Sequence, residues 1–276
     1  MEQQAGPIGI FDSGYGGLSV FKEIRKRLPQ YDYLYLGDNG RAPYGPRSFQ
    51  TVYKYTKQCI DYLFRQNCHL IILACNTASA KALRTIQQND LPKYGGQKKV
   101  LGVIRPTAEV VGSLSKTKKI GVLATSGTVA SRSYEIEIKS FFPEVEVFQE
   151  ACPMWVSLVE NNAHESPEAD GFIKKNVDNL FQKSSEIDSI ILGCTHYPLL
   201  INKIRQFVPH DVNLIPQGKI VADSLADYLE RHPEIKTLCS EHGQSRFLTT
   251  GSSGFFNRQA GIFLGEKVHS EFIRVT

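Results

Sequence analysis

The sequence predicts an α/β fold of two pseudo-symmetric lobes, each a mainly parallel sheet flanked by helices, with the active site in the cleft between them. Short apolar, β-branched runs alternate along the chain with longer segments of helical periodicity. The same order of motifs also occurs twice: a strand that opens into a turn, then a strand that ends in a cysteine. Regular alternation is typical of parallel strands joined by right-handed crossovers.

The predicted strands are apolar along most of their length, as strands covered on both faces are. They span residues 8–11, 33–36, 70–74, 100–104, 120–124, 145–148, 190–192 and 213–215.

The predicted helices carry apolar residues at helical spacing. In the segment 48–65, Val52, Tyr55, Cys59 and Tyr62 follow this pattern. A loop at 249–254 precedes a last helix. The other helices span residues 18–28, 78–88, 130–142, 169–181, 199–207 and 221–229.

The two halves of the chain share a plan at their strand ends. Asp12 follows the first strand and Cys75 ends a later one, while Thr125 and Cys194 hold the corresponding places in the other half at near-equal spacing. This recurrence indicates that the chain contains two copies of one α/β unit. The alternative is that the two halves are similar by chance.

Turn-rich segments at 90–97 and 216–218 flank the second unit. We therefore expect residues 104–216 to form one domain, and residues 1–103 together with 217–276 to form the other.

The composition excludes several classes of protein. The chain has 276 residues with 32 Lys+Arg against 28 Asp+Glu, and the densest basic run, 22–27, is typical of the outer face of a helix. The sequence has no apolar run of about 18 residues, and residues 1–4 lack the features of a signal peptide. We expect no nucleic-acid partner, no membrane segment and a cytoplasmic location.

The six cysteines should stay reduced in a long chain without an export signal. We expect no metal, because Cys194 and His196 form the only close pairing of the two ligand types at a strand end and neither CxxC nor HxxxH occurs. Four cysteines without a comparable setting are expected to be structural: Cys59, Cys68, Cys152 and Cys239.

The turn at 12–17 is rich in glycine and lies between a strand and a helix. Free backbone N–H groups at the start of a helix would hold an anion. The turn has neither GxGxxG spacing nor a phosphate-loop GK[ST], so we expect a small anion such as a carboxylate. The alternative is a turn that needs glycine for backbone reasons alone.

Cys75 and Cys194 each follow an apolar strand and should enter the next helix. The start of a helix lowers the pKa of a thiol, so we expect a reactive thiolate; a single cysteine here would more often be a small buried hydrophobe. Two thiols across a cleft suit inversion at an acidic carbon, where one removes a proton and the other returns one on the opposite face. His196 would tune or replenish the proton of Cys194, and Asp12 would hold a substrate ammonium or polarise Cys75.

The developing carbanion also has to be stabilised, and oriented backbone and hydroxyl donors would carry that burden. The available groups are Ser13, Asn76, Thr77, Thr195 and the glycine-rich turn.

Four motifs carry a likeness to a known family: Asp12-Ser-Gly-Tyr-Gly-Gly-Leu-Ser-Val20, Ala42-Pro-Tyr-Gly45, Ala74-Cys-Asn-Thr-Ala-Ser79 and Gly193-Cys-Thr-His-Tyr-Pro198. From about residue 8 to residue 264 the chain resembles bacterial glutamate racemases of the aspartate/glutamate racemase group. The resemblance implies interconversion of L- and D-glutamate without a cofactor, which provides D-glutamate for peptidoglycan and thus for cell-wall formation and cell shape.

By the same resemblance, Cys75 and Cys194 are the two acid/base residues. Glu160 resembles the acidic residue that assists the second cysteine, with an exposed helix carboxylate as the alternative. Gln217 is a departure, because Pro-Ser-Gly is commoner in the family than Pro-Gln-Gly. The implied substrate contacts are Asp12, Ser13, Tyr44, Gly45, Asn76, Thr77, Thr125, Thr195 and His196.

The sequence is also compatible with other functions. An aspartate racemase or another amino-acid racemase would share the fold, and a two-lobed small-anion-binding protein would share the cleft but would need no matched thiols. A thiol-redox role is disfavoured because CxxC is absent. The family often dimerises, so a homodimer is an expectation.

Overall fold

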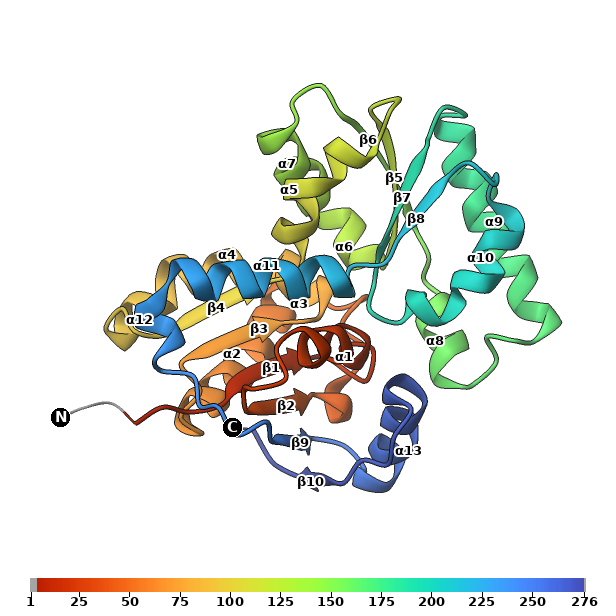
Figure 1. Cartoon of the computed structure of the whole chain (residues 1–276). Helices are drawn as coiled ribbons and strands as arrows, with labels where there is room; N and C mark the ends of the chain where they lie inside the picture. The colour runs from red at the N-terminus through yellow and green to blue at the C-terminus, as the bar shows by residue number, and fades with distance from the viewer. Residues whose placement is uncertain (1–3, 276) are drawn as a thin grey trace.

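The computed structural model describes residues 4–275 and contains two parallel sheets, each flanked by helices (Figure 1). Every strand pair recorded in these sheets is parallel. The predicted fold class is therefore confirmed. Among the described residues, no helix has both the length and the apolar character needed to cross a membrane.

The six-stranded sheet has the order β10-β9-β2-β1-β3-β4, and the four-stranded sheet has the order β6-β5-β7-β8. The four strands that come first in each half are thus arranged alike, with the first strand between the second and the third. The bounds are β1 (Ile8–Asp12), β2 (Tyr33–Gly37), β3 (Leu70–Leu73), β4 (Lys99–Gly102), β5 (Lys119–Ala124), β6 (Glu146–Ala151), β7 (Ser189–Gly193), β8 (Asn213–Ile215), β9 (Ser245–Thr249) and β10 (Ser270–Phe272).

The α-helices are α1 (Leu18–Arg27), α2 (Phe49–Arg65), α3 (Asn76–Lys81), α4 (Leu83–Thr85), α5 (Ile104–Leu114), α6 (Ser126–Ser131), α7 (Ser133–Phe141), α8 (Trp155–Glu160), α9 (Pro167–Lys183), α10 (Ile201–Phe207), α11 (Gly218–Arg231), α12 (Pro233–Lys236) and α13 (Ser253–Leu264). Short 3-10 or π turns are η1 (Asn39–Arg41), η2 (Ile86–Asp90), η3 (Leu91–Tyr94) and η4 (Tyr197–Leu200).

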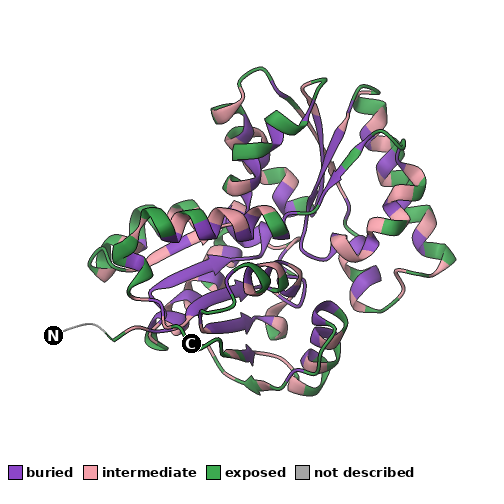
Figure 2. Ribbon diagram, viewed as in Figure 1, coloured by how far each residue is buried: buried purple, intermediate pink, exposed green. Residues whose placement is uncertain are grey.

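Successive side chains of a strand point to opposite faces of its sheet, and the core divides accordingly. Ile8 and Ile10 belong to the apolar cluster that includes α1 and α11, whereas Phe11 belongs to the cluster that includes α2 and α3. In the second sheet, Leu123 packs with α9 and Val122 packs with α5 and α7. Both sheets are therefore covered on both faces, and Figure 2 shows their central strands as buried.

The expected motifs lie at the carboxyl ends of the central strands. The eight predicted strands correspond to β1–β8 and form close to their predicted positions. The predicted strand at 100–104 was too long, because Ile104 is already the first residue of α5. Helix α5 was not predicted; its Pro106 lies in the first turn, where proline costs no hydrogen bond. Helices α8 and α12 and the short strands β9 and β10 were not predicted either.

Two predicted helices are interrupted. The segment 78–88 divides into α3, α4 and η2, and the segment 130–142 is broken at Arg132, which has a left-handed backbone with φ of 55°. A last helix does follow the loop after β9, with Ser252 accepting a hydrogen bond from the amide of Phe255.

The chain crosses from the first sheet to the second after β4 and returns after β8. On its return it enters α11, which packs against α1 and α5. We retain the boundaries at 103/104 and 216/217 as a proposal for the division into two domains.

Candidate active site

A cavity of about 310 Å³ lies at the carboxyl ends of strands from both sheets. Its walls come from the segments that follow β1, β2, β3, β5, β6 and β7. The lining residues are Ser13, Gly14, Ala42, Pro43, Tyr44, Gly45, Pro46, Cys75, Asn76, Thr77, Thr125, Ser126, Cys152, Pro153, Val156, Ser157, Glu160, Cys194, Thr195 and His196. All predicted site residues except Asp12 are thus brought together around one cavity.

Cys75 follows β3 and caps the start of α3. Its Sγ accepts a hydrogen bond from the amide of Ala78 at 3.4 Å and lies 3.3 Å from Oγ of Ser13. Burial, together with the charge of Asp12, nevertheless raises the pKa of Cys75 to about 12. Our expectation of a lowered pKa was wrong at this residue, because desolvation of the thiolate outweighs the donors at the helix start.

Asp12 ends β1 and is only 1% exposed. Its carboxylate accepts hydrogen bonds from the amide of Gly14 at 2.8 Å and from Oγ1 of Thr195 at 3.4 Å. Burial raises the pKa of Asp12. Asp12 is not among the residues that line the cavity, but its hydrogen bond with Thr195 links the end of β1 to the segment that follows β7.

Cys194 follows β7, and the chain then forms the 3-10 turn η4 before α10 begins, so this thiol does not lie directly at an α-helix start. Its Sγ lies 3.9 Å from Nδ1 of His196, and Nε2 of His196 lies 3.1 Å from Oε1 of Glu160. Burial lowers the pKa of His196, but the hydrogen bonds with Cys194 and Glu160 outweigh burial and raise it to about 10. The imidazole is therefore charged near neutral pH and donates from both ring nitrogens.

The glycine-rich turn approaches the second lobe closely at Gly16. A Cβ atom there would lie 2.4 Å from Oγ1 of Thr195 and 2.5 Å from Nδ1 of His196. The amide of Gly14 already donates to Asp12, and the amide of Ser19 donates to the carbonyl of Gly16. The turn therefore requires glycine for close packing against the Cys194 segment, and these two amides are not free to hold an anion.

Three threonine hydroxyls form a buried cluster where the two lobes meet. Oγ1 of Thr77 lies 2.9 Å from Oγ1 of Thr125 and 3.4 Å from Oγ1 of Thr128. Thr125 also accepts a hydrogen bond from the amide of Thr128 at the start of α6. Since hydroxyls donate and accept, the cluster can present donors to a carboxylate. Sequence reasoning missed Thr128, although it lies one helical turn from Thr125.

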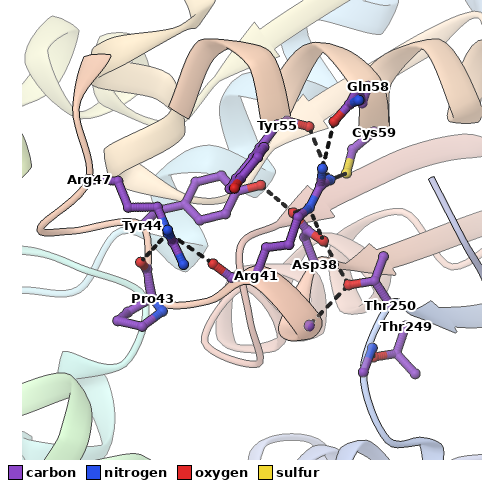
Figure 3. A network of polar contacts seen from close by, with 12 residues as sticks. Asp38, Arg41, Pro43, Tyr44, Arg47, Tyr55, Gln58, Cys59, Thr249 and Thr250 are labelled. Carbon is purple, nitrogen blue, oxygen red and sulfur yellow. Dashed lines mark hydrogen bonds and ion pairs between the residues drawn. The ribbon is translucent and has the colours of Figure 1, made fainter. Parts of the chain in front are cut away.

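Tyr44 is held by a buried polar network (Figure 3). Its hydroxyl donates to Asp38, which is fully buried and also bonds Nε of Arg41 at 2.8 Å and Oγ1 of Thr250 at 2.7 Å. Burial and the neighbouring Asp38 charge raise the pKa of Tyr44 far above its ordinary value. The hydroxyl of Tyr44 is thus committed to Asp38, so a ligand would meet its ring or its backbone.

Cys152, which we expected to be structural, is buried and also lines the cavity. It follows β6, so the rule that ligands bind at the carboxyl ends of parallel strands would have placed it there. Glu160, at the end of α8, is a cavity residue bonded to His196 rather than a free helix carboxylate. Among residues 4–275, no group of three or more His, Cys, Asp and Glu side chains is arranged to hold a metal ion.

Comparisons with known proteins place this chain in a family. The model of the Asp/Glu/Hydantoin racemase family matches residues 8–225. The chain is 41% identical over 261 residues to a glutamate racemase of Sulfurihydrogenibium sp. (strain YO3AOP1), which covers 94% of each protein.

Solved structures show the same likeness. The crystal structure of a glutamate racemase from Bacillus anthracis has a TM-score of 0.88 at 32% identity and covers 98% of this chain and 97% of that one. The glutamate racemase from Francisella tularensis subsp. tularensis SCHU S4, in complex with D-glutamate, has a TM-score of 0.86 at 30% identity and covers 99% of this chain and 98% of that one. The chain therefore belongs to the Asp/Glu/hydantoin racemase family, among its glutamate racemases.

Proposed function

We propose that this chain is an isomerase that interconverts L- and D-glutamate without a cofactor, using Cys75 and Cys194 as the two acid/base residues. The observation that carries the proposal is the placing of two thiols, one after β3 and one after β7, on the walls of one cavity. The D-glutamate bound in the Francisella relative supports the choice of substrate.

The proposed reaction conserves protons. The thiolate of one cysteine takes the α-proton and leaves a carbanion, and the thiol of the other cysteine gives a proton to the opposite face. The product is the other enantiomer, and the two sulfurs have exchanged protonation states. The reverse direction uses the same groups in exchanged roles.

The two thiols have different supports. Cys194 faces the charged imidazole of His196, which is held in turn by Glu160. Cys75 faces a neutral hydroxyl, that of Ser13, and burial together with the charge of Asp12 raises the pKa of Cys75. A charged donor beside sulfur stabilises its anion more than a hydroxyl does. We therefore propose that the resting enzyme holds Cys75 as the thiol.

The cavity suits a small anionic substrate. Its volume of about 310 Å³ is at the small end of the range for ligand sites. Hydroxyls of Ser13, Thr77, Thr125 and Thr195 and the amide of Asn76 provide donors around it. Acid–base catalysis supplies typically 10²–10⁴-fold, so these oriented donors would supply much of the remaining stabilisation of the carbanion.

Racemisation in deuterated buffer tests the proposal. Each glutamate enantiomer is incubated with the protein without added cofactor, and optical rotation and loss of the α-proton signal are followed together. We expect both to change, starting from either enantiomer. Unchanged rotation and an intact α-proton, or activity only with pyridoxal phosphate or a metal, would overturn the proposal.

Aspartate is the matched alternative substrate. It carries the same groups on a side chain shorter by one methylene, so its distal carboxylate would not reach the donors that hold that of glutamate. We expect kcat/KM to be much higher for glutamate. A higher value for aspartate would assign the chain to aspartate racemisation instead.

Three further proposals concern the chain in the cell. The D-glutamate that it makes would supply peptidoglycan synthesis, which growth of a D-glutamate auxotroph carrying this chain would test. The cytoplasmic location and the homodimer stay predictions, and cell fractionation and analytical ultracentrifugation would test them.

A further inference from the structure

Gln217 is a buried polar residue at the point where the chain returns to the first lobe. It is 3% exposed and directly precedes α11. Its Nε2 donates to the carbonyl oxygen of Val103 at 3.1 Å and to Oγ1 of Thr107 at 2.8 Å. Val103 directly precedes α5, where the chain first enters the second lobe. One side chain thus joins both crossings between the lobes.

The other end of the same side chain reaches the active site. Oε1 of Gln217 accepts a hydrogen bond from Nδ2 of Asn76 at 2.8 Å. Asn76 is the first residue of α3, directly after Cys75, and lines the cavity. Its Oδ1 accepts a hydrogen bond from the hydroxyl of Tyr134 at 2.6 Å, and Tyr134 lies in α7 of the second lobe.

A backbone carbonyl fixes which groups donate and which accept in this chain of hydrogen bonds, which runs from Val103 through Gln217 and Asn76 to Tyr134. The oxygen of Val103 can only accept, so the amide nitrogen of Gln217 must face it. Oε1 of Gln217 then faces Asn76 and requires Nδ2 on that side, which leaves Oδ1 of Asn76 for the hydroxyl of Tyr134. Burial raises the pKa of Tyr134 far above its ordinary value, so its hydroxyl keeps the proton that it donates.

We propose that Gln217 is a positioning residue that orients the side-chain amide of Asn76 toward the substrate. It also ties Asn76 to the two segments in which the chain passes between the lobes. One N–H of Asn76 is used by Gln217, so the second N–H is the one that Asn76, as a cavity residue, can offer to a ligand. Rotation of the Asn76 amide by 180° would place an oxygen against Oε1 of Gln217 and an NH2 group against the Tyr134 hydroxyl. This inference rests on the proposed function, since it treats Asn76 as a substrate contact.

Serine at this position would have one hydroxyl on a side chain shorter than that of glutamine by two heavy-atom positions. It would not span the distance from Asn76 to Val103 and Thr107. Gln217→Ser therefore releases Asn76 without removing any cavity residue. We expect kcat/KM for glutamate to fall about fivefold, the effect of losing the one of the three Gln217 hydrogen bonds that orients Asn76.

A double-mutant cycle with Asn76→Ala separates positioning from a general structural effect. If Gln217 acts through Asn76, then Gln217→Ser lowers kcat/KM in the wild-type background and changes it less than twofold in Asn76→Ala. Gln87→Ser is the control, because Gln87 also donates to a backbone carbonyl, that of Val100, and no hydrogen bond between the described residues joins it to Asn76. The control should leave kcat/KM unchanged.

A second measurement covers the case in which Asn76→Ala is too slow to assay. In 15N spectra, Asn76→Ala identifies the side-chain NH2 signals of Asn76, and Gln217→Ser should shift them while Gln87→Ser does not. A full fivefold loss from Gln217→Ser in both backgrounds, unchanged kcat/KM in the single variant, or unshifted Asn76 signals would overturn the inference. Absence of glutamate racemisation by the wild-type protein would instead overturn the proposed function.

Discussion

The Sγ atom of Cys194 lies 3.9 Å from Nδ1 of His196, whose Nε2 is held by Glu160 at 3.1 Å. No imidazole faces Cys75 among the recorded contacts of the described residues; its neighbours are Ser13 and the Ala78 amide. The two thiols of the site therefore lie in unlike surroundings, and under the proposed mechanism substitutions on the two sides should have different kinetic signatures.

Replacing His196 with glutamine should slow the step in which Cys194 takes the α-proton. The loss of a charged hydrogen bond costs about 1.5–3 kcal/mol, so we expect kcat/KM to fall about 10 to 100-fold. Two enantiomers have equal free energy, so kcat/KM must fall equally in both directions. The asymmetry will be seen in the primary deuterium isotope effect, which should rise only in the direction that uses Cys194 as the base.

Ser13→Ala provides the mirror-image control for this experiment. The isotope effect should then rise in the opposite direction, where Cys75 is the base. An isotope effect that rises equally in both directions for both variants would contradict the proposal that His196 assists Cys194 and that Ser13 assists Cys75.

The charged state of His196 should also make stability depend on pH. Its pKa in the folded protein is about 10, above the ordinary value of 6.5, so folding favours the protonated form. The resulting stabilisation is complete below pH 6.5 and is lost as the pH rises through 10. The free energy of unfolding of the wild type, minus that of His196→Gln, should therefore shrink between pH 7 and pH 9.5 in urea titrations. A constant difference would contradict the raised pKa.

Asp12 should control how easily the thiol of Cys75 ionises. Burial and the charge of Asp12 raise the pKa of Cys75 to about 12, so little thiolate exists at pH 8. Asp12→Asn removes the charge and should lower this pKa, which speeds alkylation of Cys75 by iodoacetamide at a given pH. Peptide mass spectrometry over a pH series measures the rate, with Asp223→Asn, at a half-buried site on α11, as the control. Equal rates for Asp12→Asn and the wild type would show that burial alone sets the pKa.

Gly16→Ala should displace the Cys194 side of the site. The added Cβ would lie 2.5 Å from Nδ1 of His196 and 2.4 Å from Oγ1 of Thr195, so those side chains have to move. We expect a loss of racemisation of at least about 10-fold, since catalytic geometry tolerates little displacement.

Gly171→Ala, in α9, is the matched control for this substitution. Nothing lies within 4 Å of the added Cβ there. This change should raise stability by roughly 0.5–1 kcal/mol, because alanine is the better helix former, and should leave activity intact. Full activity of Gly16→Ala would contradict the close approach of the two lobes at this turn.

The central strands and the strand-end residues were predictable because both depend on local sequence. Continuous apolar runs marked β1, β3, β5 and β7, and parallel topology then placed Cys75 and Cys194 at neighbouring edges of the two sheets. The edge strand β10 has only three residues, Ser270–Phe272, and is partly polar, so it is too short to show the alternation of apolar residues that would predict a strand.

The parts of the site that escaped prediction depend on contacts between distant segments. The raised pKa of Cys75 arises from burial beside Asp12, and the commitment of the Tyr44 hydroxyl arises from Asp38. In the sequence, Gln217 is only a difference from the family pattern at an expected domain boundary. Its hydrogen bond with Asn76 depends on the fold. Such relations are set by packing, which a single sequence does not specify at the level of individual atoms.

Racemisation by single-thiol variants tests the central claim most directly. Cys75→Ser and Cys194→Ser each keep a side chain of similar size but replace the thiol by a far weaker acid. Racemisation, followed by optical rotation from both L- and D-glutamate, should fall by at least about 10²-fold in each variant, the smaller estimate for acid–base catalysis. Circular dichroism should show both variants folded. Full activity in either folded variant would contradict the account, because it would remove that cysteine from the two-base mechanism.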